Sequence, residues 1–94
     1  MHGLSKETYN KIKDVLNEYS QCKVVLFGSR AKGNYKYNSD IDLAIINDVS
    51  SDIIDSLRNA LSELNIIYKI DFVVVKEASN EKLVTNIMNE GVEF

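Results

Sequence analysis

The stretch LFGSRAKGNYKYNSDIDLAI, residues 26–45, decides the fold and raises the question of function. An apolar run ends at Gly28-Ser29, a small, basic and aromatic segment follows, and Asp40-Ile41-Asp42 then enters a second apolar run. Carboxylates are costly to bury unless they are paired with cations or bound to a metal. Two carboxylates, one residue apart at the mouth of an apolar strand, therefore predict a cationic ligand at that end.

Apolar runs on either side of this stretch predict a small α/β (α+β) domain. The sheet is expected to be mixed, with about three strands and with helices packed on one face. The predicted strands are 23–27, 41–46 and 69–75. Three helices are predicted, and they begin after Ser5, at Ser51 or Asp52, and after Ser79 or Asn80. Gly91 is expected to end the last helix. A short helical turn is expected directly after Gly28. The helix between the second and third strands favours a parallel crossover, whereas the first two strands could be antiparallel or mixed.

Asp40 and Asp42 point to the same face of their strand because strand side chains alternate. Their Cα atoms are expected about 6.5–7 Å apart. Asp71 interrupts the third strand and joins them if that strand lies beside the second. Three carboxylates without basic partners would repel one another, and magnesium, which favours carboxylate oxygens, waters and substrate phosphates, would resolve that repulsion. Two such ions suit an in-line displacement at phosphorus.

Gly28 and Ser29 supply the complementary half of the predicted site. Gly28 ends a strand and allows a tight turn, and a helical turn starting at Ser29 would present a hydroxyl and N–H groups to phosphate oxygens. Arg30 places positive charge near the same spot. The sequence leaves three roles open for Ser39: orienting the first carboxylate, contacting phosphate, or capping the turn. Tyr35 and Tyr37 flank this loop, and the sequence leaves two interpretations open: exposed loop residues, which are common, or rings that stack on a nucleotide base.

Composition narrows the classes of protein that need to be considered. The chain has 94 residues, which predicts one domain spanning 1–94, and its net charge of −3 argues against a broad nucleic-acid-binding face. The single cysteine, Cys22, allows no internal disulfide and fits a reducing compartment. No apolar run reaches the length of a membrane span. We therefore expect a cytoplasmic protein without direct nucleic-acid or membrane contact. His2 is expected to lie in a frayed terminus, away from Cys22.

The small and acidic residues of this region resemble the signature of the nucleotidyltransferase superfamily related to DNA polymerase beta. More narrowly, the chain is similar to the minimal nucleotidyltransferase (MNT) family, and the resemblance spans essentially its whole length. The matching residues are Gly28-Ser29, Ala31, Gly33, Ser39-Asp40, Asp42-Leu43 and Asp71.

This resemblance implies a nucleotidyltransferase fold and a magnesium-dependent enzyme. Such an enzyme moves a nucleoside monophosphate, most simply AMP from ATP, onto a hydroxyl and releases pyrophosphate. By position, Gly28 and Ser29 would hold the β and γ phosphates, with Arg30 and Ser39 nearby. Asp40 and Asp42 would hold two magnesium ions, and Asp71 would bind the one nearest the acceptor and help remove its proton.

The resemblance also implies a partner. Members of the MNT family commonly pair with a HEPN-family ribonuclease toxin, which implies a hetero-oligomer and an antitoxin that adenylylates a tyrosine of that toxin. Two alternatives stay open from the sequence. One is a non-catalytic module that neutralises its partner by binding, and the other is nucleotidyl transfer to a small molecule.

Overall fold

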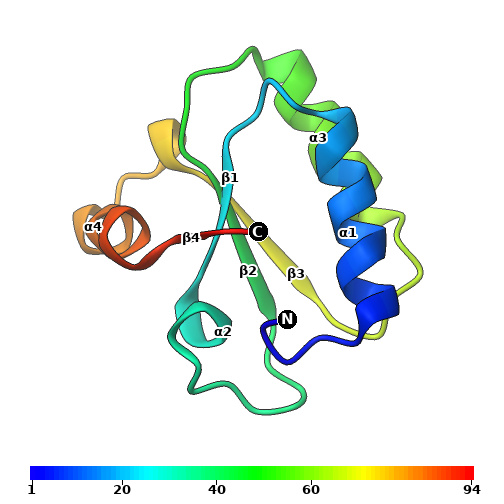
Figure 1. The fold of residues 1–94 in the computed structure, drawn as a ribbon. Helices are drawn as coiled ribbons and strands as arrows, with labels where there is room; N and C mark the ends of the chain where they lie inside the picture. Colours follow the sequence, from blue (N-terminus) through cyan, green and yellow to red (C-terminus); the bar gives the residue numbers. More distant parts are fainter.

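The computed structural model describes residues 1–94 and contains one four-stranded sheet flanked by helices (Figure 1). Spatially, the strands follow the order β3-β2-β1-β4. In chain order the elements are α1 (Lys6–Glu18), β1 (Val24–Phe27), α2 (Gly28–Lys32), β2 (Ile41–Ile45), α3 (Ser51–Ser62), β3 (Ile70–Val74), the short 3-10 helix η1 (Val75–Glu77), α4 (Glu81–Glu90) and β4 (Val92–Glu93).

The sheet is mixed, as the sequence predicts. Strands β1 and β2 are antiparallel, which settles the orientation that the sequence left open. Strands β2 and β3 are parallel and are joined through α3, so the predicted parallel crossover is confirmed. The structure adds the two-residue strand β4, which pairs antiparallel with β1. A strand this short has no periodicity that could be recognised in the sequence.

Helices cover both faces of the sheet, which corrects the expectation that they pack on one face. Leu43 of β2 belongs to the larger apolar cluster, together with Ile12 of α1 and Leu57 of α3. The next residue, Ala44, belongs to a smaller cluster with Ile87 of α4. Because neighbouring strand residues point to opposite faces, α4 lies across the sheet from α1 and α3 (Figure 1).

Helix ends follow the capping residues that the sequence provides. The Ser5 hydroxyl accepts a hydrogen bond from the Thr8 amide, and the Asn80 side chain accepts one from the Leu83 amide. The bond at Ser5 measures 3.1 Å, and so does the bond at Asn80. Both caps satisfy an N–H that would otherwise lack a partner at the first turn. No helix of the structure combines the length and the apolar character that crossing a membrane requires.

The N-terminal segment is packed against the body of the protein and is not frayed as expected. The His2 ring lies 6.0 Å from the Phe94 ring, centroid to centroid. Phe94 also stacks on Tyr9 at 4.8 Å, and the Tyr9 hydroxyl donates to the Phe94 carbonyl oxygen. The two ends of the chain are therefore held together over α1.

The position of the core predicts that two aliphatic-to-alanine substitutions differ sharply in how much they lower the free energy of unfolding. Leu43→Ala removes a side chain that is fully buried, so we expect it to lower the free energy of unfolding by about 2–5 kcal/mol. Ile67→Ala is the matched control, because Ile67 is 91% exposed, and we expect a change within about 0.5 kcal/mol. Urea denaturation followed by circular dichroism measures both. Similar losses for the two variants would contradict the assigned core.

Candidate active site

Asp42 and Asp71 lie directly opposite each other on neighbouring parallel strands. The β2–β3 register pairs Asp42 with Asp71, and the β1–β2 register pairs Asp42 with Phe27, the residue before Gly28. The sequence-based condition for Asp71, that β3 lies beside β2, is therefore met. Three segments far apart in sequence meet at this end of the sheet.

Gly28 is packed against the Asp42 carboxylate. Its φ angle of +74° lies in the left-handed region that disfavours residues with a side chain. A Cβ atom at this position would overlap Oδ2 of Asp42. Glycine is thus required twice, by the backbone conformation and by the space that the carboxylate occupies.

The Asp42 carboxyl is electrostatically strained. Burial, together with the negative charges of Asp71 and Asp40 and a contact with the Asp71 side chain, raises the pKa of Asp42 to about 6, while Arg30 acts in the opposite direction. Because the pKa of Asp42 is raised, the positive charge that the protein places near this carboxyl does not balance the effects of burial and of the neighbouring carboxylates. A bound cation would supply further positive charge and would favour the ionised form.

One basic side chain pairs with the acidic residues, which corrects the expectation of carboxylates without basic partners. Lys69 Nζ lies 3.4 Å from Asp71 Oδ1, in a pair whose side chains are 72% and 42% exposed. An ion pair this exposed is weak and readily exchanged. Lys69 precedes β3 by one residue, and a lysine two positions before an aspartate was the sequence signal for this pair.

Asp40 is exposed and lies one residue before β2 begins. It is close enough for its charge to raise the pKa of Asp42, yet the protein does not gather three ligating side chains into a closed metal cage. Magnesium usually keeps several waters and takes further oxygens from substrate phosphates. An open, oxygen-only donor set of this kind fits a metal–nucleotide complex better than a dedicated protein-supplied metal site.

Ser29 occupies the first turn of α2, which begins where β1 ends. The residue before the helix, Phe27, provides no side-chain hydrogen bond to cap it. The first N–H groups of α2 therefore remain available to an external acceptor. The short helix places them next to the Asp42 carboxylate, because Gly28 contacts that group.

Arg30 and Ser39 both make hydrogen bonds to the backbone of the protein itself. The Arg30 side chain is 1% exposed and donates hydrogen bonds to backbone carbonyl oxygens. The Ser39 hydroxyl accepts from the Lys36 amide at 2.8 Å, so this serine caps the turn that precedes Asp40. Capping of the turn was one of the roles that the sequence left open for Ser39, whereas the inward direction of Arg30 depends on the placement of α2 and could not be read from the sequence.

The two loop tyrosines differ in environment. Arg30 lies over the Tyr35 ring, with its guanidinium carbon 5.1 Å from the centroid, so Tyr35 is part of the protein's own packing. Tyr37 is 84% exposed. Tyr68, which the sequence did not single out, forms the second aromatic face against Arg30, at 4.8 Å.

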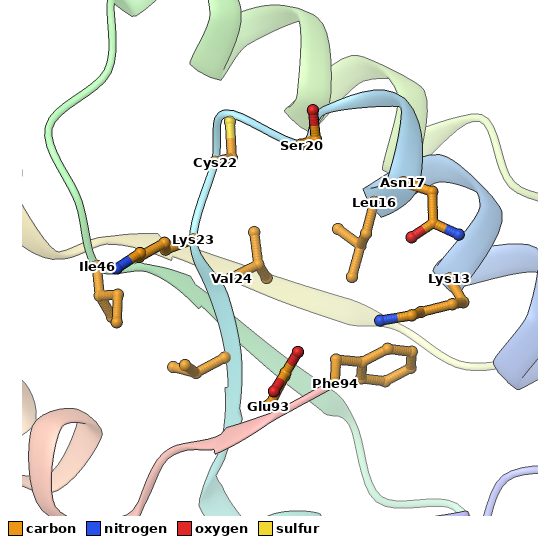
Figure 2. A pocket seen from close by; sticks show the side chains of 11 residues that line it. Lys13, Leu16, Asn17, Ser20, Cys22, Lys23, Val24, Ile46, Glu93 and Phe94 are labelled. Carbon is orange, nitrogen blue, oxygen red and sulfur yellow. The ribbon is translucent and has the colours of Figure 1, made fainter.

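The largest cavity lies away from these residues. It measures about 450 Å³ and opens between α1 and the β1–β4 edge of the sheet, where Lys13, Leu16 and Phe94 line it (Figure 2). None of the three aspartates contributes to its wall. We assign the candidate site to the carboxylates instead, because Asp42, whose pKa is raised, lies opposite Asp71 and beside Gly28, and a strongly perturbed pKa is typical of functional sites.

The crowding at Gly28 predicts a difference between two glycine substitutions. Gly28 and Gly33 both have positive φ angles, but only residue 28 meets another group where a Cβ would lie. We expect Gly33→Ala to cost about 1–2 kcal/mol of folding free energy from the backbone alone. Gly28→Ala should cost more, because it also displaces the Asp42 carboxylate. Equal losses in urea denaturation would contradict the packing described here.

The raised pKa of Asp42 predicts a pH-dependent gain in stability for Asp42→Asn in the metal-free protein. The unfolded carboxyl ionises near its ordinary value of 3.8 and the folded one near 6. Between these values the folded state binds more protons, so the contribution of Asp42 to stability falls as pH rises. Asparagine removes this loss. The melting temperature of the variant should exceed that of wild type at pH 8, with the gain disappearing below pH 4.

Asp14→Asn is the matched control for this experiment, because Asp14 is an exposed carboxylate on α1. Circular dichroism melts in a chelating buffer at several pH values measure all three proteins. A gain for Asp42→Asn that is the same at every pH would show that the charge of Asp42 is not its cause.

Comparisons with known proteins agree with this geometry. A relative from Methanocaldococcus jannaschii, provisionally named a protein adenylyltransferase, is 35% identical over 75 residues that cover 73% of each protein. A second relative, from Haemophilus influenzae and provisionally named the protein adenylyltransferase MntA, is 43% identical over 49 residues, which cover 50% of this chain and 43% of that protein.

A solved structure has the same fold. It is a toxin–antitoxin crystal structure with AMP-PNP, and one of its chains aligns with a TM-score of 0.57 and 25% identity, covering 89% of this chain and 69% of that one. The family model described as polymerase beta, nucleotidyltransferase matches residues 10–94, which include all the site residues discussed above. The chain therefore belongs to the polymerase beta nucleotidyltransferase family, and it is an enzyme domain of the nucleotidyltransferase class.

Proposed function

We propose that this protein transfers AMP from ATP to a hydroxyl of a partner protein, and that it acts as the antitoxin of a toxin–antitoxin pair. The observation that carries the chemistry is the pairing of Asp42 with Asp71 across β2 and β3, beside Gly28. The names of the relatives, protein adenylyltransferases, support a protein as the acceptor. The toxin–antitoxin structure with AMP-PNP supports both an adenine nucleotide and a toxin partner.

In this proposal Asp40, Asp42 and Asp71 hold two magnesium ions. When bound, magnesium neutralises charge on the triphosphate and makes the acceptor hydroxyl more acidic. The raised pKa of Asp42 supports this assignment, because a cation would relieve the repulsion among the three carboxylates.

The remaining roles fall to groups at the start of α2 and on β3. The uncapped N–H groups of α2 and the Ser29 hydroxyl donate hydrogen bonds to the β and γ phosphates. The acceptor oxygen attacks the α phosphorus, the bond from that phosphorus to the bridging oxygen breaks, and pyrophosphate leaves. Asp71 takes the proton of the acceptor hydroxyl. Most of the catalysis is positioning and charge neutralisation, as is general for phosphoryl transfer.

The finer identity of the partner is also part of the proposal. We infer a HEPN-family ribonuclease toxin and a tyrosine acceptor, because the MNT resemblance implies that pairing. Residues 1–94 then act as one minimal nucleotidyltransferase domain in the cytoplasm, where ATP and magnesium are supplied. The acceptor site is provided by the partner in the complex.

The test uses ATP labelled at the α phosphate, magnesium, this protein and the product of the adjacent gene. We expect label on the partner protein with wild type, and a loss of at least about 100-fold with Asp42→Asn, because mutating residues that only orient a metal ligand already costs about 10–100-fold and Asp42 is proposed as a ligand itself. Asp14→Asn should label normally. Mass spectrometry of the labelled partner then identifies the acceptor residue.

The other outcomes separate the alternatives. If the complex forms without any transfer of label, the protein acts by binding alone. Label that appears only on small molecules would indicate a small-molecule acceptor. Either result would refute protein adenylylation, and Asp42→Asn would retain its affinity for the partner in the first case.

A further inference from the structure

Arg30 is the only charged residue that the fold buries, and no carboxylate pairs with it. Its side chain is 1% exposed, whereas every ion pair of the structure involves other residues. Burying a guanidinium is unfavourable unless its donors are satisfied. The protein satisfies them with backbone carbonyl oxygens and with two aromatic faces, so the position of this side chain is fixed by several groups at once.

The guanidinium joins three parts of the chain. Nε and one terminal nitrogen, Nη2, both donate to the Ser39 carbonyl oxygen, at 3.1 and 2.9 Å. The same nitrogen reaches the Tyr37 carbonyl oxygen at 3.3 Å, and the other one, Nη1, donates to the His2 carbonyl oxygen at 2.9 Å. The group also contacts the faces of the Tyr35 and Tyr68 rings. Arg30 thus holds the N-terminal segment, the 33–40 loop and the segment before β3 in one arrangement.

The segment held most firmly is the one that presents Asp40. The Ser39 carbonyl oxygen, which accepts two of the Arg30 bonds, belongs to the peptide unit that leads into Asp40. On the other side, the Ile41 amide donates to the Lys69 carbonyl oxygen at 2.9 Å. Asp40 itself is exposed, so packing of its own side chain does not fix it. Its backbone is held by these two flanking contacts.

We propose that Arg30 is a positioning residue that holds the Ser39–Asp40 peptide unit, and through it the Asp40 carboxylate, in place beside Asp42. This proposal rests on the proposed metal-dependent function in one respect, because it treats Asp40 as a ligand. Arginine is required for its planar fork, which reaches the Ser39, Tyr37 and His2 carbonyl oxygens simultaneously. Lysine would keep the charge but could not span these acceptors.

The test compares Arg30→Lys with wild type in the full-length protein. Two quantities are measured: the magnesium concentration that half-saturates ATP binding, and the hydrogen-exchange rate of the Ile41 amide in the metal-free protein. We expect the magnesium concentration to rise about 10–100-fold, the range for residues that orient a metal ligand. The Ile41 amide should exchange at least about tenfold faster, while the Ile46 amide, bonded to Lys23 at the other end of β2, should not change.

A second pair of variants separates positioning from general stability. Tyr68→Leu removes one aromatic face from Arg30 without removing its charge, and we expect the same two effects at smaller size. Ile12→Val is a conservative truncation at a fully buried residue of α1 that makes none of the hydrogen bonds or ring contacts of Arg30, and it costs about 0.5–1.5 kcal/mol. Each protein is measured at the same number of degrees below its own melting temperature. Under these conditions Ile12→Val should leave the magnesium requirement for ATP binding and the exchange rate of the Ile41 amide unchanged.

The possible results are distinguishable. If Ile12→Val raises the magnesium requirement as much as Arg30→Lys does, Arg30 acts only through stability and the proposal is overturned. Unchanged exchange at Ile41 in Arg30→Lys overturns it as well. If wild type binds no magnesium–ATP, the proposed function fails, yet faster exchange confined to Ile41 would still establish that Arg30 holds this segment.

Discussion

The Asp42 carboxylate lies in the space that a side chain on residue 28 would fill, and it faces Asp71 on the next strand. This crowding is the constraint on which the rest of the site depends. It fixes glycine at the end of β1, because both the space and the positive φ angle exclude other residues. It also brings the start of α2 against an acidic group whose pKa is raised to about 6.

The sheet makes this arrangement possible through its strand order. Strand β2 lies between β1 and β3, so Asp42 can meet Gly28 on one side and Asp71 on the other. The apolar side chains of β2 on the opposite face, such as Leu43, are buried under α1 and α3. A register shift of one residue would exchange these two faces and turn the carboxylates toward the apolar cluster under α1 and α3. The hydrophobic pattern of the strand therefore positions the acidic residues.

A buried guanidinium completes the structure around this end of the sheet. Arg30 has no carboxylate partner and contacts carbonyl oxygens and aromatic rings instead. Because these groups come from different segments, Arg30 connects parts of the chain that share no regular secondary structure. Its positive charge also lowers the pKa of Asp42, opposing the neighbouring carboxylates. The same residue thus joins the loop to the N-terminal segment and moderates the charge of the site.

Local features were determined by the sequence alone. The cap at Ser5, a cap at Ser79 or Asn80 and the three main strands follow from residue type and from the apolar pattern. The tight turn at Gly28, where a strand leads directly into a helix, also follows from residue type, whereas the Asp42 carboxylate beside it was placed by the sheet. Each of these features depends on neighbours within a few residues, and that is the range over which sequence patterns are informative.

Only the tertiary structure decided the features that depend on distant segments. Asp71 joined Asp42 because the parallel crossover placed β3 beside β2 in a register that the sequence does not encode locally. Arg30 turned inward to carbonyl oxygens because α2 packs against β1 and β2 and because Tyr68 arrives from before β3. The position of α4 on the second face and the pairing of β4 with β1 likewise depend on packing between elements. Such contacts join residues that are far apart in the chain, so their geometry depends on how the helices and strands pack against one another.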